Sequence, residues 1–317
     1  MRGPVPHVGG EMGARLNHFL DACPPGERAR ILERTREVHA RLADWAKPYG
    51  IFPPVRFPAI AISMAAAAPW LGAGPLVEMA MIPTWIYAID DAFDQRVFTA
   101  VERAPRVARY AAIAAGRLRP PAGDAYASAL EELTARLAAY PQWRACSGDW
   151  AANCRRMLAG MAFECDVADR IRAGGAAPSL RTYLQHGLHS IGVPLYLTGA
   201  WVIDSCPEAD AHLEALRRLA RAAGRAVRLA NDLRTHEKEA GEGNLNAIML
   251  LRRTEPEAAA RSVQRRLRAA MRRLLASEGA NLPIRSAEMV LRVTRFAVDL
   301  YADHDYHTIP PERILAP

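Results

Sequence analysis

The sequence contains little that resembles a β-strand. Runs of β-branched residues are short, and the apolar/polar alternation of a half-buried strand is hard to find between the turn signals. Alanine and arginine dominate instead, and clusters of proline and glycine separate long helical patterns. At 317 residues and 50% hydrophobic content, the chain can fill a substantial core. We therefore predict an all-α globular protein.

Cysteine is sparse and follows no ligand or disulfide pattern. The five cysteines are odd in number, form no CxxC pair and do not stand near histidine at metal-ligand spacing. They are Cys23, Cys146, Cys154, Cys165 and Cys206. We interpret them as reduced core residues in a cytoplasmic protein.

The N-terminus lacks the apolar stretch of a secretory signal. A longer uncharged run does occur over residues 57–77, but prolines and glycines divide it and Glu78 follows directly, so we expect buried helices and no membrane span. We find no internal repeat and no convincing linker. We expect residues 1–25 to form a flexible N-terminal segment and residues 26–317 to form a single α-helical domain.

The net charge of +7 raises the possibility of nucleic-acid binding. The most basic stretch, residues 261–275, instead spaces Val263, Leu267 and Leu274 as one apolar stripe and leaves its arginines on the remaining surface. Aromatic stacking platforms and known nucleic-acid motifs are missing. We predict a solvated helix face and no nucleic-acid partner.

Three carboxylates crowd the end of an apolar segment in "PTWIYAIDDAFDQRVF". On a helix, Asp90, Asp91 and Asp94 share one face, because they are three and four residues apart. Unpaired carboxylates this close repel one another. Divalent cations would neutralise them, and sites rich in carboxylate oxygen suit Mg2+; a solvated helix end is the alternative for this motif taken alone.

A second set of oxygen ligands stands in "NDLRTHEKE". Asn231, Thr235 and Glu239 recur at every fourth residue, so their side chains fall on nearly one line of a helix. Such a line is able to hold a hard cation. Each motif is short and common by itself, whereas the pair in this order is far more specific.

The pair resembles that of the class I terpene synthases, and the likeness extends over residues 50–310. It implies an all-α helical bundle around a central apolar active-site cavity. It also implies three Mg2+ ions, with Asp90 and Asp94 as ligands on one side and Asn231, Thr235 and Glu239 on the other. Asp91 would orient neighbouring side chains.

Other segments are similar to the family too. In "LQHGLHSIGVPLYLTGAW", Ser190 and Gly192 match the break in one family helix. Arg228, Lys238 and Tyr306 match residues that hold the substrate diphosphate. The arginine with which many bacterial members sense diphosphate is missing: Gln185 stands at its position, with Arg181, His186 and His189 nearby. The C-terminal Arg-Tyr pair of bacterial members is Asp305-Tyr306 here, which is closer to the plant enzymes.

The implied reaction is ionisation of an isoprenyl diphosphate followed by cyclisation. The carbocation needs an apolar pocket with aromatic faces. Candidates, each as consistent with ordinary core packing, are Tyr87, Phe163, Tyr196, Trp201 and Tyr301. A chain-elongating enzyme would need a second aspartate-rich motif in place of Asn231, Thr235 and Glu239, and the DxDD motif of protonation-initiated cyclases is absent.

We predict a diterpene synthase that uses geranylgeranyl or copalyl diphosphate, because the residues around the presumed cavity are small. A sesquiterpene synthase that uses farnesyl diphosphate is the close alternative. A non-catalytic basic helical protein that binds nucleic acid or a membrane surface is the distant one. The family is often dimeric, which leaves a homodimer open.

Overall fold

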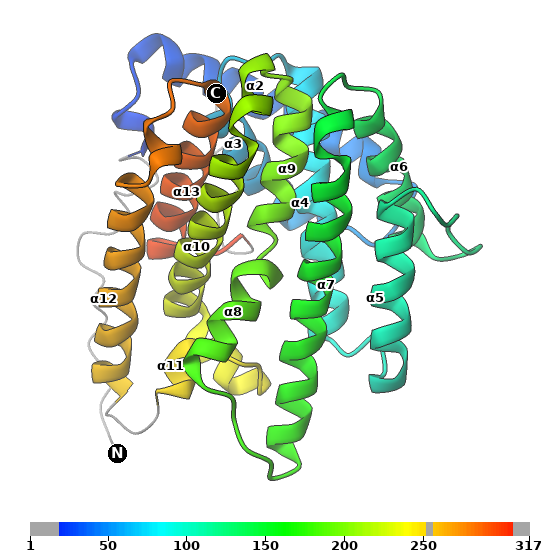
Figure 1. Ribbon diagram of the computed structural model, residues 1–317, viewed down its shortest axis with the longest axis vertical. Coiled ribbons are helices and arrows are strands. Elements are labelled where there is room, and N and C mark those ends of the chain that lie inside the picture. Colours follow the sequence, from blue (N-terminus) through cyan, green and yellow to red (C-terminus); the bar gives the residue numbers. More distant parts are fainter. Residues whose placement is uncertain (1–18, 252–255, 307–317) are drawn as a thin grey trace.

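The protein is a bundle of α-helices (Figure 1). The computed structural model describes residues 19–251 and 256–306, and no β-strand occurs within those ranges. The α-helices, in chain order, are α2 (Pro25–Ala46), α3 (Phe57–Ala67), α4 (Ala73–Asp94), α5 (Ala100–Ala114), α6 (Ala125–Ala138), α7 (Trp143–Arg172), α8 (Leu180–Ser190), α9 (Val193–Asp204), α10 (Leu213–Glu242), α11 (Ala247–Leu250), α12 (Pro256–Leu275) and α13 (Arg285–Asp303). Short 3-10 helices cover Pro54–Arg56, Pro207–His212 and Glu278–Asn281. The predicted all-α class is confirmed.

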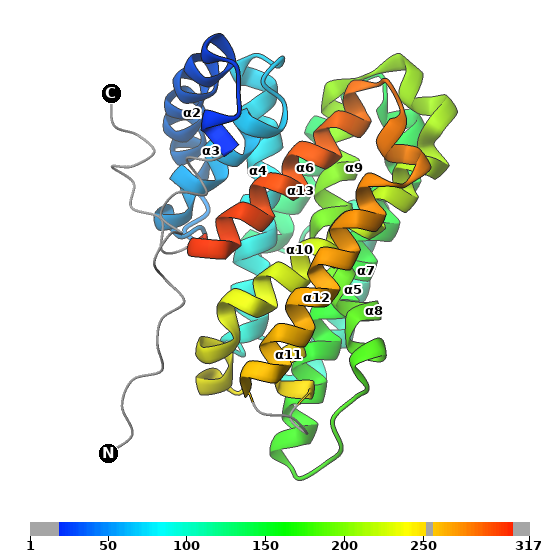
Figure 2. The same ribbon diagram turned by 90° about the vertical axis from the view of Figure 1, so that its left-hand side faces the viewer.

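Two long helices organise the bundle. Helices α7 and α10 have 30 residues each and run along its long axis. Helix α10 packs against α8, α9, α12 and α13, while α7 packs against α5, α8 and α9. In the view of Figure 2, α12 and α13 lie over α10 on the side facing the viewer. Helices α7 and α10 therefore each have one face toward the centre of the bundle and another toward its periphery.

The most apolar helices lie at the centre. Every residue of α3 and of α9 is buried, and α4 is buried over most of its length. A helix that is apolar on all sides is expected to be enclosed by other helices. The uncharged run at 57–77 forms α3 and the start of α4, as predicted. None of the helices in the described part of the chain is both long and apolar enough to cross a bilayer.

The basic helix α12 has the predicted amphipathic arrangement. Val263 and Leu274 are fully buried on the side that packs against α10, and the arginines of the helix are exposed. The apolar stripe thus fixes α12 to the bundle, and the arginines face away from the core.

The chain breaks between α8 and α9. Ser179 caps the start of α8 by accepting a hydrogen bond from the backbone N of Thr182 over 3.1 Å. The helix ends at Ser190, and Gly192 has a φ of 77°, a left-handed conformation that favours glycine. Val193 and Pro194 then begin α9. The break falls at the residues singled out in the sequence.

Glycines let the neighbouring helices approach this break closely. A Cβ atom on Gly160 of α7 would lie 3.1 Å from the backbone N of Ser190, and one on Gly224 of α10 would lie 2.4 Å from the carbonyl O of Leu188. Side chains at these positions would push the helices apart. Three helices therefore meet at the end of α8.

The proposed division of the chain stays a prediction. Residues 1–18 of the expected flexible segment lie outside the described residues, whereas residues 19–21 are helical. Leu20 is buried, and the ring of Phe19 packs edge-on against Phe296 of α13, with centroids 5.5 Å apart. All five cysteines are free thiols; four are buried and Cys23 is half-buried.

Candidate active site

Both predicted motifs line one polar cavity of about 100 Å³. The aspartates come from the last turns of α4, and Asn231, Thr235 and Glu239 come from the second half of α10. Helix α7 contributes Glu164, which belongs to neither motif. Side chains that line the cavity include Arg56, Ile86, Tyr87, Asp90, Asp91, Asp94, Arg96, Glu164, Ser190, Ile191, Arg228, Asn231, Thr235, Lys238, Glu239, Glu242, Asn244, Tyr301, Asp305 and Tyr306.

Three carboxylates of the cavity, those of Asp90, Asp94 and Glu239, hold protons more tightly than ordinary ones. Burial, and after it the negative charges of Asp94 and Glu164, raise the pKa of Asp90 well above its usual value. Burial, Glu164 and Glu239 raise the pKa of Asp94 to about 7. Burial also raises the pKa of Glu239, although the positive charge of Arg228 acts against it. The cavity is therefore a concentrated negative site that favours a cation.

Asp91 does not share the environment of Asp90 and Asp94. Its Oδ1 accepts a hydrogen bond from Nη2 of Arg56 over 2.7 Å. The guanidinium of Arg56 also lies over the ring of Tyr87, 4.9 Å from the centroid. Arg56 is buried at the end of the short helix before α3 and was not anticipated from the sequence. This pairing supports the interpretation of Asp91 as an orienting residue.

Glu239 is held by a residue that follows α10. Nδ2 of Asn246 donates to Oε2 of Glu239 over 2.6 Å and to the backbone O of Asp232 over 2.9 Å. Oδ1 of Asn246 accepts from the backbone N of Ile248 and so caps α11. Asn246 is fully buried. The carboxylate of Glu239 is thus fixed in direction before any cation reaches it.

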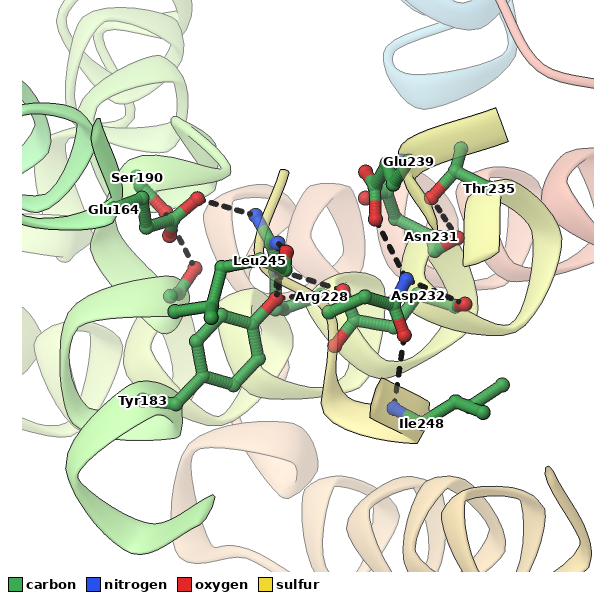
Figure 3. Close-up of polar contacts among 12 residues, drawn as sticks. Glu164, Tyr183, Ser190, Arg228, Asn231, Asp232, Thr235, Glu239, Leu245 and Ile248 are labelled. Atoms are coloured by element: carbon green, nitrogen blue, oxygen red, sulfur yellow. Dashed lines mark hydrogen bonds and ion pairs between the residues drawn. The ribbon is translucent and has the colours of Figure 1, made fainter. Parts of the chain in front are cut away.

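Arg228 lies at the centre of a buried network (Figure 3). Its Nε lies 2.9 Å from Oδ1 of Asp232, its Nη1 lies 3.3 Å from Oε2 of Glu164, and its Nη2 donates to the hydroxyl of Tyr183. That hydroxyl donates in turn to Asp232 over 2.8 Å. Gly187 leaves room for the side chain, since a Cβ atom there would lie 3.2 Å from Cγ of Arg228. Arg228 is therefore held in one position beside the cavity.

The other two predicted diphosphate residues lie in different surroundings. Lys238 is exposed at the cavity, with its Nζ 3.9 Å from Oε1 of Glu242. The hydroxyl of Tyr306 lies 3.3 Å from Oγ of Ser63, and its ring packs against Tyr87 with centroids 4.9 Å apart. Tyr306 thus meets the helix of the first motif one turn before Asp91.

A second, apolar cavity of about 50 Å³ adjoins the first. The two cavities share one wall, formed by Ile86, Tyr87, Ile191, Tyr301 and Tyr306. Three of the five predicted pocket aromatics, Tyr87, Tyr196 and Tyr301, line this second cavity, and Gly192 lies there too. Val227 of α10 and Phe296 of α13 complete its apolar lining with other side chains.

Phe163 and Trp201, the other two predicted pocket aromatics, line neither of the two cavities. The ring of Phe163 stacks on His186 of α8, with centroids 3.8 Å apart. The indole N of Trp201 donates to the backbone O of Ser286 over 3.2 Å, within the core between α9 and α13. Both aromatics serve helix packing instead.

Neither Gln185, at the position of the missing diphosphate sensor, nor Arg181, His186 or His189 lines the polar cavity. Arg181 and Gln185 line a separate surface groove with Arg225. Burial, followed by the positive charges of nearby arginines, lowers the pKa of His189 to about 4, so this side chain is neutral near pH 7. The cationic side chains that do line the cavity are Arg56, Arg96, Arg228 and Lys238.

The residues that line the polar cavity suit a Mg2+ ion that is bound by protein and phosphate oxygens together. Within the described residues, no group of three or more histidine, cysteine, aspartate or glutamate side chains is arranged to hold a metal unaided. Mg2+ in phosphate-binding enzymes is commonly held by one or two carboxylates, with phosphate and water oxygens completing the shell. Two carboxylates on α4 and a mixed oxygen set on α10, facing one cavity, match that kind of site.

An all-α bundle in which a carboxylate-lined cavity adjoins an apolar one is the architecture of a class I terpene synthase. Residues 82–273 match the family model "Terpene synthase family 2, C-terminal metal binding". The chain belongs to this family and is a terpene synthase enzyme that acts in isoprenyl diphosphate cyclisation. The alternative of a non-catalytic basic protein is therefore wrong.

Known proteins agree with this assignment. The ent-pimara-9(11),15-diene synthase of Streptomyces sp. (strain KO-3988) is 29% identical over 85% of this chain and 90% of its own length. The linalool/nerolidol synthase of Streptomyces clavuligerus, solved with 2-fluorogeranyl diphosphate, aligns with a TM-score of 0.66 and 20% identity over 84% of this chain and 94% of its own. The 2-methylisoborneol synthase of Streptomyces coelicolor A3(2), solved with Mg2+ and geranyl-S-thiolodiphosphate, aligns with a TM-score of 0.65 and 19% identity over 87% of this chain and 91% of its own. The two structures share the fold of this protein.

Proposed function

We propose that the protein ionises an isoprenyl diphosphate with the help of three Mg2+ ions and cyclises the hydrocarbon to a diterpene. The observation that carries the proposal is the shared wall between the two cavities. A prenyl diphosphate has a strongly anionic head and an apolar tail. The polar cavity offers charged ligands, and the adjoining cavity offers mainly apolar and aromatic side chains.

The charged chamber is suited to leaving-group departure. Asp90 and Asp94 on α4 would hold Mg2+ together with Asn231, Thr235 and Glu239 on α10, and the metal would supply positive charge to the departing diphosphate. Arg228 is already fixed beside the cavity, and Lys238 reaches it from the solvent side. Charge placed in advance where negative charge develops lowers the barrier to ionisation.

The apolar chamber is suited to the carbocation that follows. Tyr87, Tyr196 and Tyr301 present aromatic faces, which stabilise a cation by cation–π contact without offering a strong nucleophile. The buried helices α3, α4 and α9 exclude water from this side. Cyclisation then depends on how the tail folds against these walls.

We propose geranylgeranyl diphosphate or copalyl diphosphate as the substrate. Ent-pimara-9(11),15-diene, named as the product of the similar Streptomyces enzyme, is a diterpene hydrocarbon. Small side chains in the lining of the apolar cavity, namely Ser63, Gly192 and Ala297, support the same choice. A sesquiterpene synthase acting on farnesyl diphosphate is the alternative.

The test is direct incubation with each substrate. Purified protein and Mg2+ are combined separately with geranyl, farnesyl, geranylgeranyl and copalyl diphosphate, and products are read by gas chromatography–mass spectrometry. A cyclic diterpene that disappears with chelator or with Asp90→Ala is the expected result. A product from farnesyl diphosphate alone would keep the mechanism and overturn the substrate; no product from any of the four would overturn both.

We further propose that the enzyme works in the cytoplasm, which its five free thiols support. A homodimer is the assembly that we propose from the family likeness. Sedimentation velocity of the purified protein over a range of concentrations tests it, and a single species of 34.8 kDa would exclude the dimer.

A further inference from the structure

A carboxylate from neither metal motif lies where the helix break meets the polar cavity. Glu164 of α7 lines this cavity, and its side chain is 19% exposed. Its Oε1 accepts a hydrogen bond from Oγ of Ser190 over 2.5 Å, and its Oε2 lies 3.3 Å from Nη1 of Arg228. Figure 3 shows Glu164 between these two partners. One carboxylate thus joins the end of α8 to the arginine proposed to meet diphosphate.

The position of Glu164 is fixed by close helix packing. Gly160 stands one turn earlier on α7, where a Cβ atom would lie 3.1 Å from both N and Cβ of Ser190. The close approach brings α7 against the last turn of α8, so that the Glu164 carboxylate reaches Ser190. The hydroxyl hydrogen bond and the ion pair then leave the carboxylate little freedom to turn away.

Arg228 has two acidic partners with different access to the cavity. Asp232 is fully buried and does not line the polar cavity, whereas Glu164 does. An anion that enters the cavity therefore meets Glu164, and not Asp232, as its competitor for the guanidinium. The same anion also meets the carboxylates of Glu164, Asp90 and Asp94, which line the same cavity.

We propose that Glu164 is a positioning residue that makes diphosphate binding depend on divalent cation. Its negative charge opposes a bare diphosphate, both by repulsion and by occupying Arg228. A diphosphate that arrives with Mg2+ brings compensating positive charge to the same carboxylates and is accepted. The inference rests on the proposed function, since it assumes that this cavity binds Mg2+ and diphosphate.

The proposal has a thermodynamic signature. If Mg2+ tightens diphosphate binding by some factor, diphosphate tightens Mg2+ binding by the same factor, and this factor measures the coupling. Glu164→Gln keeps an oxygen that accepts from Ser190 but removes the charge. We expect this variant to bind bare pyrophosphate more tightly and to show a coupling factor about tenfold smaller than that of the original protein, within the usual range of such couplings.

The experiment is isothermal titration calorimetry with inorganic pyrophosphate, in EDTA and at saturating Mg2+, on the full-length protein. Glu164→Asp keeps the charge and is expected to retain most of the coupling. Asp166→Asn is the matched control: it removes one negative charge from the same helix, but its side chain is 61% exposed and paired with Arg103 outside the cavity. Its coupling factor is expected to stay unchanged. Circular dichroism and thermal melts verify that each variant is folded.

The outcomes distinguish a failure of the proposed function from a failure of the role proposed for Glu164. Failure of the original protein to bind Mg2+ and pyrophosphate together would overturn the proposed function. Binding with an unchanged coupling factor in Glu164→Gln would overturn only the role of Glu164. A variant that binds bare pyrophosphate as before but loses Mg2+-dependent binding would also overturn it, because Glu164 would then be acting as a metal ligand.

Discussion

Arg56 and Asp91 form an ion pair at 2.7 Å that joins the start of α3 to the last turn of α4. Arg56 is 3% exposed and also covers the ring of Tyr87. The pair fixes one of the three neighbouring aspartates that line the polar cavity. One cation from outside the motifs thereby orients Asp91 at the end of α4.

Replacing Arg56 with alanine is expected to destabilise the protein. Asp91 would then lose its cationic partner while remaining beside Asp90 and Asp94. We expect a loss of about 2 kcal/mol in the free energy of unfolding, less than for a fully enclosed pair because Asp91 keeps some contact with water. Urea denaturation in EDTA measures it. Arg30→Ala, at an exposed position of α2, serves as control, and equal effects of the two variants would contradict the role of the pair.

The stability of the metal-free protein is expected to depend on Asp94. Its pKa of about 7 in the folded state exceeds the ordinary value of 3.8, so the folded state holds the proton more tightly than the unfolded state. The stabilising contribution is complete below about pH 4 and is lost as the pH rises through 7. In EDTA, the melting temperature should therefore decrease between pH 5.5 and pH 8 by more in the original protein than in Asp94→Asn.

Mg2+ together with pyrophosphate should reverse that loss, because the cation neutralises the same carboxylates. The increase in melting temperature on adding both should be larger at pH 8 than at pH 5.5, where Asp94 is mostly protonated. An increase that is independent of pH would argue against Asp94 as a ligand.

Asn246 is expected to control metal affinity without touching the metal. Its amide orients the Glu239 carboxylate, and partners that orient a ligand typically change metal affinity by about 10- to 100-fold. In Asn246→Ala, the Mg2+ concentration for half-maximal activity should rise within that range, with kcat at saturating Mg2+ less affected. Asn281→Ala removes an exposed asparagine that does not line the polar cavity, and it should leave both the half-maximal Mg2+ concentration and kcat unchanged.

Tyr196 and Trp201 offer a paired test of the apolar cavity. Tyr196→Phe removes a buried hydroxyl for which no hydrogen-bond partner occurs among the described residues, so the free energy of unfolding should stay within about 0.5 kcal/mol. Its product distribution should change, because the side chain lines the cavity. Trp201→Phe should do the opposite: it loses the hydrogen bond to Ser286 and some packing, at a cost of about 1 to 3 kcal/mol, with unchanged products.

The sequence predicted the features that depend on local spacing. Asp90, Asp94, Asn231, Thr235 and Glu239 could be placed on helix faces because helical periodicity is regular, and the structure brings all five to one cavity. The helix break was likewise visible in the small and proline residues after Ser190.

Residues that act through tertiary contacts were missed. Arg56 and Asn246 reach the motifs from other segments, and no local pattern shows which carboxylate they will meet. Glu164 reaches the cavity from α7, and its sequence neighbours do not show which way it faces, because adjacent residues of a helix point in different directions. Phe163 and Trp201 line neither cavity, and the sequence could not show this, because helix rotation and neighbouring elements decide which side an aromatic faces.

The wall shared by the two cavities limits how this enzyme can be altered. Ile86 and Ile191 each have one surface toward the charged chamber and another toward the apolar one. A substitution there that reshapes the hydrocarbon skeleton also moves the surface against which the leaving group is held. Substitutions at these two positions are therefore expected to change product choice and turnover together. Engineering for a new skeleton has more freedom at Val227 and Phe296, which line the apolar chamber but not the charged one.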